Sequence, residues 1–405
     1  MLSKQQSLLI EILRNFCKKE EINFDPNGCD LSELYQISYE HNLDSLVYMQ
    51  IRKKLESRNQ HNMFLRSLLN DVFCDVNRRD MLREFTSYME EIKVPFICMK
   101  GSVFRDYYPI PTVRSMGDVD IIIKPEDKET VDDIFVNKMG FTRFVDNHSV
   151  WTYYLKDFQF EVHNHMFYEE LTSDFDYIEY FDHIFEHIHH DKVFDIESDY
   201  LYVPDENYHF LYLMTHTAKH IINNGSGFRA YLDMVMFTRN NNKLNWEWIR
   251  EELKKMNLLQ FTETCFALCE RWFDVKMPLP HKELDESFFE EITEKTFNDG
   301  VFGLDNKENE GAHTAKEIKR ENRGYWLTSI RLMTHLLFPP YEDMILAPWY
   351  SFLKGKRWLL PFAWIYRWIY CIIHKFGFAL NRLTEPFRIK EKIEKREDYI
   401  NTWGL

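Results

Sequence analysis

Two short apolar runs interrupt an otherwise helical pattern and constrain the fold of this chain more than any other feature. The first, VPFICM at residues 94–99, has the length of a buried strand, and the turn KGSVFRDYY follows it. The second, DVDIIIK at 118–124, predicts another buried strand that begins with two carboxylates. Strands and helices alternate here within a short stretch, so we expect a small mixed α/β unit.

The rest of the pattern places this unit between helical regions. Apolar residues recur every three or four positions before it, and an amphipathic helix at 125–141 and strands at 150–156 and 158–167 complete it. From Pro204 the pattern is helical again, with Asp205 as the predicted N-cap. We therefore expect an α+β chain of four regions, which are 1–92 (helical), 93–203 (mixed sheet), 204–345 (helical, with an exposed polar segment at 305–322) and 346–405 (a basic aromatic tail).

The charge of the chain is unevenly distributed. The formal net charge is −15, which argues against a broad nucleic-acid-binding face. Residues 354–392, however, hold nine Lys/Arg and two Asp/Glu, a net of +7, which leaves −22 for the remainder. The Trp-rich stretch 358–380 is long enough to span a bilayer, but Pro361 and Arg367 lie within it. Three interpretations stay open for this tail: a membrane span, an interfacial amphipathic helix, or a helix packed on the acidic body or on a partner.

The cysteines and the N-terminus indicate the compartment. Seven cysteines are scattered without a CxxC pair, which is typical of reduced thiols in the cytoplasm. The apolar run at the N-terminus is interrupted by Glu11 and Arg14 and does not read as a signal peptide. We expect a cytoplasmic protein, with peripheral attachment at the inner membrane surface as one role for residues 354–392.

Asp118 and Asp120 carry the strongest chemical signal. Two residues apart on a strand, their carboxylates point to the same side, with Val119 facing the other way. Adjacent carboxylates repel unless a cation lies between them, and Mg²⁺ (or Mn²⁺) favours such oxygen ligands. Glu161 lies between Phe160 and Val162 on a later strand and would complete a two-metal site.

The turn before this strand offers groups for phosphate binding. At Gly101 a phosphate can approach the backbone closely, and Ser102 can cap the following helix and donate to a phosphate oxygen. A Gly-Ser pair before a helix is by itself an ordinary turn. Lys100 and Arg114 flank the same region, and a guanidinium at the second position could hold a triphosphate.

These segments together resemble the nucleotidyltransferase superfamily of the DNA polymerase β type. More narrowly, MKGSVFRDYYP, RSMGDVDIII and FEVHNH resemble the motifs of a bacterial family described as uncharacterised nucleotidyltransferase. The resemblance extends to H-x-x-K-H and R-x-x-x-D patterns in the helices that follow. Glu161 departs from the Asp that is more usual there, and the 15 residues between Ser102 and Asp118 suit the narrower family.

The resemblance implies a minimal nucleotidyltransferase sheet in region 93–203 and a metal-dependent reaction. A nucleoside monophosphate would pass from an NTP to a hydroxyl of a small-molecule, peptide or glycan acceptor, with release of pyrophosphate. Asp118 and Asp120 would hold two Mg²⁺ (or Mn²⁺) ions. Glu161 would bind the metal that activates the acceptor hydroxyl, and Gly101 and Ser102 would hold the β and γ phosphates.

Five residues of the following helices and one histidine complete the predicted site. By the resemblance, the helix with His216, Lys219 and His220 packs over the catalytic domain and contacts nucleotide or acceptor. His163 falls on the same strand face as Glu161 and could support the site or bind the acceptor. Arg229 and Asp233 lie at i and i+4, and this pair is either a helix salt bridge or part of the site.

Two other functions stay open at this point. The same metal site could serve glycosyl or phosphoryl transfer in peptide tailoring or polysaccharide biosynthesis. Alternatively, the chain could be a non-catalytic, nucleotide-binding or membrane-docked regulatory protein. Nothing in the sequence marks a purine or pyrimidine pocket, so the expected partners are an NTP of open identity and an unknown acceptor.

Overall fold

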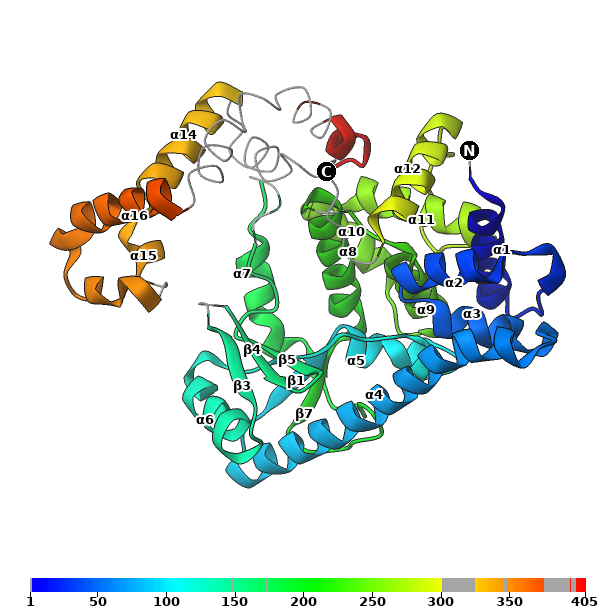
Figure 1. Ribbon diagram of the computed structural model, residues 1–405, viewed down its shortest axis with the longest axis horizontal. Coiled ribbons are helices and arrows are strands. Elements are labelled where there is room, and N and C mark those ends of the chain that lie inside the picture. The colour runs from blue at the N-terminus through cyan, green and yellow to red at the C-terminus, as the bar shows by residue number, and fades with distance from the viewer. Residues whose placement is uncertain are drawn as a thin grey trace. The chain divides into compact units, whose positions relative to one another are not determined.

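The computed structural model (Figure 1) divides the chain into two compact units. The structure describes residues 2–146, 149–169, 171, 174–223, 225–300, 325–345, 348–374, 394 and 398–405. The first unit comprises Met1–Glu169, Phe175–Leu304 and Leu405, and the second comprises Glu170–Asp174 and Asp305–Gly404. The polar segment predicted at 305–322 and residues 375–392 of the basic stretch lie outside the described residues.

Helices form the beginning of the first unit, as the periodicity predicted. Ser3 and Ser57 each accept a hydrogen bond from the backbone N–H three residues later, and the Gln there reaches back, so both helices begin with a capping box. The last and longest of these helices runs for 35 residues. The helices are α1 (Lys4–Lys18), α2 (Leu31–Glu40), α3 (Asp44–Ile51) and α4 (Arg58–Ile92).

A mixed seven-stranded sheet follows, in the order β3-β4-β5-β2-β1-β7-β6. β1 pairs antiparallel with β2, and β2 pairs parallel with β5. The four predicted strands are confirmed as β1, β2, β4 and β5, whereas β3, β6 and β7 were not predicted. The strands are β1 (Phe96–Met99), β2 (Asp118–Ile122), β3 (Thr142–Asp146), β4 (Val150–Leu155), β5 (Phe158–His163), β6 (Ile188–His189) and β7 (Leu201–Pro204), with α5 (Gly101–Phe104) after β1 and α6 (Lys128–Asp133) after β2.

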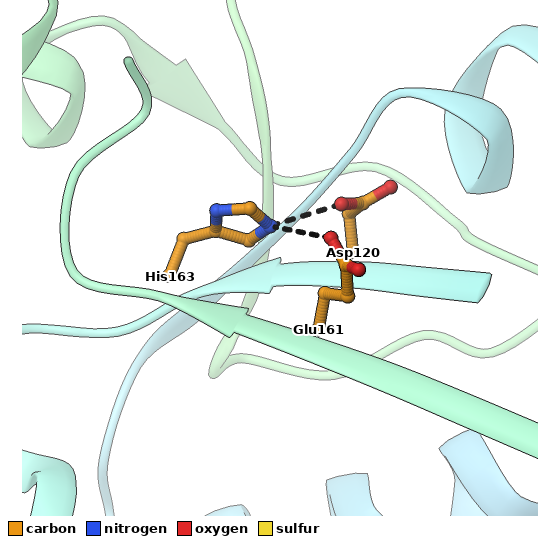
Figure 2. Close-up of side chains that lie close together, drawn as sticks. All are labelled: Asp120, Glu161 and His163. Atoms are coloured by element: carbon orange, nitrogen blue, oxygen red, sulfur yellow. Dashed lines mark hydrogen bonds and ion pairs between the residues drawn. The ribbon is translucent and has the colours of Figure 1, made fainter. Parts of the chain in front are cut away.

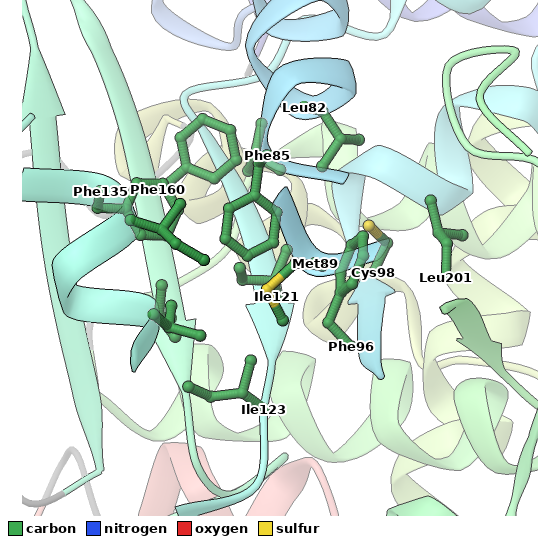
Figure 3. Close-up of a cluster of buried hydrophobic side chains, with 14 of the residues drawn as sticks. Leu82, Phe85, Met89, Phe96, Cys98, Ile121, Ile123, Phe135, Phe160 and Leu201 are labelled. Carbon is green, nitrogen blue, oxygen red and sulfur yellow. The ribbon is translucent and has the colours of Figure 1, made fainter. Parts of the chain in front are cut away.

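Period-two alternation gives the sheet an apolar face and a polar face. On the apolar side, Ile121 of β2 belongs to the same buried cluster as Phe85 and Met89 of α4, which runs along the sheet (Figures 1 and 3). Asp118 and Asp120 alternate along β2 with Val119 and Ile121, so their side chains lie on the opposite face. Truncating a fully buried ring such as Phe85 would cost about 3–5 kcal/mol, so this cluster fixes where the carboxylates stand.

A second set of helices completes the first unit. The Asp205 carboxylate accepts hydrogen bonds from the backbone N–H groups of Asn207 and Tyr208, which confirms it as the N-cap of α8. The α+β prediction is thus confirmed, with helical regions on both sides of the mixed sheet. The helices are α7 (Tyr177–Asp182), α8 (Glu206–Asn223), α9 (Phe228–Asn240), α10 (Trp246–Lys255), α11 (Leu259–Phe273) and α12 (Glu286–Asp299).

The second unit has its own small core. Met344, Tyr350, Leu353 and Ala363 are buried together. None of the helices that the structure describes combines the length and the apolar composition needed to cross a bilayer. The described helices of this unit are α14 (Tyr325–Leu337), α15 (Tyr341–Met344) and α16 (Leu360–His374). The four-region division of the chain stays a prediction.

Candidate active site

The parallel pairing of β2 with β5 brings the predicted carboxylates together. Asp120 lies directly beside Glu161 in this register, so the strand of the third carboxylate does neighbour the Asp-x-Asp strand. His163 joins them from the same strand face (Figure 2). Its Nε2 lies 2.9 Å from Asp120 Oδ1 and 3.7 Å from Glu161 Oε2, and donor atoms of all three residues lie within 4.8 Å of one another. We call these three residues the acidic cluster.

Lys100 places a positive charge directly on the acidic cluster. It follows β1 in a strained backbone conformation, with φ +54° and ψ −128°, which a residue with a Cβ rarely adopts. Its backbone N–H donates to Nε2 of His209 at 3.2 Å, and its ammonium donates to Asp120 Oδ1 at 2.6 Å. The ammonium therefore compensates the carboxylate that is most deeply buried in the cluster.

The environment sets different protonation states for neighbouring groups. Burial opposes ionisation of Asp120, but Lys100 and the hydrogen bond from His163 hold its pKa at about 2. Burial and the two aspartates raise the pKa of Glu161 to about 7. Burial, followed by the charge of Lys100, lowers the pKa of His163 to about 4, so its neutral ring donates Nε2–H to Asp120. Asp118 is half-buried, and burial together with Asp120 raises its pKa.

The donors of the acidic cluster fit a divalent cation. Two carboxylates and an imidazole converge from one sheet face, and such a set suits Mn²⁺ as well as Mg²⁺, which favours oxygen ligands. In the structure Nε2 of His163 donates to Asp120, so binding a cation through Nε2 requires the proton to lie on Nδ1, which is buried without a hydrogen-bond partner among the described residues. The predicted ligand set was Asp118, Asp120 and Glu161. The structure groups His163 with the last two, and places Asp118 in the wall of the same cavity.

A cavity of about 280 Å³ joins the acidic cluster to the helices that follow the sheet. Asp118, Asp120 and Glu161 line one side of it. α8 and α9 supply basic and imidazole side chains to the same lining, as the resemblance implied for this part of the chain. These residues, which we call the basic wall, are His216, Lys219, His220 and Arg229.

Gly101 and Ser102 differ in their relation to the cavity. Gly101 lines it, and a Cβ there would lie 2.5 Å from Nη1 of Arg114, so the guanidinium occupies the space that a side chain would need. The Ser102 hydroxyl is buried and donates to the carbonyl of Met99 at 2.7 Å. That hydroxyl therefore serves the turn in this structure, and Ser102 is not among the cavity-lining residues.

Arg114 is held by Asp233 in a buried ion pair. Its Nε and Nη2 donate to the two Asp233 carboxylate oxygens at 3.1 and 2.7 Å, and the hydroxyl of Tyr108 donates to the same carboxylate at 2.7 Å. The i,i+4 spacing predicts a pair between Asp233 and Arg229, whereas the structure directs both carboxylate oxygens to Arg114. Arg229 instead donates to the backbone carbonyl of Ser115 at 3.3 Å.

The positive charge of the basic wall is partly neutralised by neighbouring groups. Lys219 pairs with Glu169 at 3.0 Å and lies 4.5 Å from the ring centre of Tyr168. The rings of His216 and His220 are 4.5 Å apart, and burial is the main cause that lowers the pKa of both, to about 4 for His220. Both imidazoles are therefore neutral at pH 7 and can donate or accept hydrogen bonds.

Several residues that line the cavity were missed by reasoning from the sequence. Tyr212 lines the cavity one helical turn before His216, so the i,i+4 spacing within α8 could have found it. The first turn of α9 also faces the cavity, through Ser226, Gly227 and Ala230. The N-cap of α9 is Gly227, which has no side chain to cap the helix, so the local sequence contains no capping motif that would have predicted this helix start as part of the site.

Together the mixed sheet, the acidic cluster and the basic wall define a candidate metal-binding transferase site. The family described as uncharacterised nucleotidyltransferase matches residues 27–274, which is more than half of the chain, and the chain belongs to this family. Comparison with curated proteins and with solved structures finds no significant match. The resemblance noted in the sequence is thus confirmed, and the family and the acidic cluster support nucleotidyl transfer at the general level.

Proposed function

We propose that the protein transfers a nucleoside monophosphate from an NTP to a hydroxyl of a small-molecule, peptide or glycan acceptor, and releases pyrophosphate. The observation that carries this proposal is the cavity whose lining combines the carboxylates of Asp118, Asp120 and Glu161 with the cationic side chains of Lys100, Lys219 and Arg229. Nucleotidyl transfer needs both kinds of group, because cations must neutralise the phosphates while carboxylates hold those cations.

Asp120, Glu161 and His163 are the residues we assign to a divalent cation, with Asp118 beside them. Mg²⁺ or Mn²⁺, when bound, supplies charge neutralisation at the phosphates and lowers the pKa of a coordinated hydroxyl. Lys100 already lies against Asp120 and lines the cavity, so its ammonium is placed to turn from the carboxylate to a phosphate oxygen.

The phosphate side of the nucleotide fits the start of α9. This helix has 13 residues, its first N–H groups receive no side-chain cap, and Arg229 and Ala230 of its first turn line the cavity. The N–H of Ala230 donates to the Gly227 carbonyl at 3.2 Å, and the positive dipole end of the helix favours an anion there. α5, in contrast, has four residues, and the hydroxyl of Ser102 is engaged by the turn. We therefore assign the β and γ phosphates to the start of α9 with Lys219.

The acceptor side is assigned to the neutral imidazoles of His216 and His220. Neutral rings can accept a hydrogen bond from a hydroxyl without adding charge to the site. The reaction would take place in the cytoplasm, where NTPs are available, and the seven cysteines are free thiols in the structure. These assignments and the location are proposals.

The test uses purified full-length protein with labelled NTPs and either Mg²⁺ or Mn²⁺. We expect metal-dependent nucleotide binding in the wild type and its loss in Asp118→Ala/Asp120→Ala. Glu126→Ala/Asp127→Ala, which removes two carboxylates just beyond the same strand, is the matched control and should bind normally. Unchanged nucleotide binding and transfer in Asp118→Ala/Asp120→Ala would refute the assignment of these aspartates to the metal site.

Mass spectrometry of acceptor mixtures identifies the transferred group. Incubation with each NTP and with nucleotide sugars should add the mass of a nucleoside monophosphate to an acceptor and release pyrophosphate. Addition of a phosphoryl or glycosyl group would assign the same site to a different transfer. Absence of any metal-dependent nucleotide binding would overturn the proposal in favour of a non-catalytic protein.

A further inference from the structure

α16 in the second unit has one face that is firmly attached to its neighbour. The side chains of Trp364, Arg367 and Trp368 donate hydrogen bonds of 2.9, 2.6 and 2.8 Å to backbone carbonyls at the C-terminal end of α14 and in the loop just after it. Carbonyls at the end of a helix have no partner within the helix, so these donors satisfy groups that need them. Arg367, which argued against a membrane span in the sequence, is thus used inside the unit.

The opposite face of α16 is apolar and exposed. Its members recur at spacings of three and four, so they form one stripe along the helix. Their exposed fractions lie between 45% and 67%, and because they lie side by side they form a contiguous apolar patch and not scattered surface residues. The stripe, which we call the outer face, consists of Phe362, Ile365, Tyr366, Ile369, Tyr370 and Ile373.

A basic loop lies directly before this helix. The hydroxyl of Tyr341 accepts from the N–H of Gly355 and donates to a neighbouring carbonyl, both at 2.8 Å, which fixes the loop on α15. Lys354 and Lys356 are exposed in the loop, and the Trp358 ring that follows them is 71% exposed. Arg357 in the same segment pairs with Glu342 of α15, so Lys354 and Lys356 supply the positive charge that the loop exposes beside the outer face.

We propose that the outer face of α16, with Lys354 and Lys356, docks this protein on an anionic phospholipid surface. The isoleucines and Phe362 would enter the boundary between headgroups and acyl chains, and Tyr366, Tyr370 and Trp358 have the amphipathic rings that favour the headgroup level. The lysines would meet lipid phosphates, to which their positive charge is complementary. Charge complementarity selects the bilayer over a neutral apolar partner as the occupant of this face.

The test measures co-flotation of the full-length protein with vesicles of phosphatidylcholine, alone or mixed with phosphatidylglycerol. We expect flotation only with the anionic vesicles, weakened by salt because the charges are exposed. Lys354→Gln/Lys356→Gln should reduce partitioning about fivefold per lysine, or roughly 25-fold for the pair. Ile365→Glu/Ile369→Glu should abolish flotation, since charges then replace the apolar stripe.

A matched control comes from α4, which also exposes apolar residues four positions apart. Val72→Glu/Val76→Glu introduces the same charges at the same spacing and should float like the wild type. The proposal is overturned if the wild type does not float. It is also overturned if the Ile365→Glu/Ile369→Glu variant floats normally, or if that variant loses thermal stability or a dimeric state, which would assign the outer face to the chain's own body or to a second copy.

Discussion

The ion pair between Arg114 and Asp233 yields the most direct energetic prediction. Both side chains are almost fully buried, with exposed fractions of 9% and 6%, and two N–H donors of the guanidinium meet both carboxylate oxygens. Arg114→Met would leave the Asp233 carboxylate buried, with a hydrogen bond from the Tyr108 hydroxyl. Breaking a buried pair in this way costs about 3–5 kcal/mol, because the remaining charge is not compensated.

The expected shift in Tm follows from the size of the first unit. Unfolding entropy is about 2.1 cal/mol/K per residue, or roughly 0.6 kcal/mol/K for about 300 residues, so Arg114→Met should lower Tm by about 5–8 °C. Arg143→Met is the matched control, since Arg143 pairs with Asp132 at 3.1 Å with exposed fractions of 41% and 26%. An exposed pair contributes under about 1 kcal/mol, so the control should move Tm by at most about 2 °C.

Circular dichroism during thermal unfolding of the full-length chain, with urea titrations as a second measurement, tests this prediction. The double variant Arg114→Met/Asp233→Leu should recover part of the loss, because it removes the uncompensated charge as well. The reasoning is refuted if Arg114→Met is no less stable than the Arg143→Met control. Strict additivity of the two single substitutions in the double variant would refute it equally.

Three further predictions concern the site and its support. Lys100→Met should bind Mn²⁺ at least about tenfold more tightly without nucleotide, because an ammonium about 5 Å from a divalent cation repels it by on the order of 2–6 kcal/mol. Titration with Mn²⁺ followed by electron paramagnetic resonance measures this affinity, and Lys124→Met, at an exposed lysine, is the control that should not change it. Gly101→Ala should destabilise the chain by about 1–3 kcal/mol, because its Cβ would lie 2.5 Å from a guanidinium nitrogen, and urea unfolding with normal stability would contradict this. Burial lowers the pKa of His41 to about 4 and of His209 to about 3, so the unfolded chain binds more protons than the folded chain below pH ~6.5. The free energy of unfolding should therefore be retained above that pH and fall as the pH drops toward 4. Urea midpoints that do not move between pH 7.5 and 5 would contradict this prediction.

Local periodicity predicted much of the fold. Alternation within DVDIII placed Asp118 and Asp120 on one face of a strand, and the structure bears this out, with Ile121 in the apolar cluster behind them. The helical spacing before and after the sheet likewise predicted most of the helices. β6 was missed because it has two residues, and β7 was missed because it is placed by its parallel pairing with β1, about 100 residues earlier in the chain.

The structure brings many of the predicted site residues together, but their role in a reaction stays a prediction. Lys100, Gly101, Arg114 and the residues of α8 and α9 all line one cavity with the carboxylates. Their contacts could not be predicted, because each partner lies far away in sequence. Arg114 pairs with Asp233 over 119 positions, and Lys100 reaches Asp120 from a neighbouring strand.

The sequence by itself determined which chemical groups this protein carries and which of them share a face of one strand or helix. That information is local, because repeat distances of two and 3.6 residues follow from backbone geometry alone. Only the tertiary structure decided that His163 joins Asp120 and Glu161 and that Asp118 stands beside this cluster. The register between β2 and β5 is set by the apolar packing behind them, and a shift of β5 by one residue would carry Glu161 and His163 to the other face, away from Asp120.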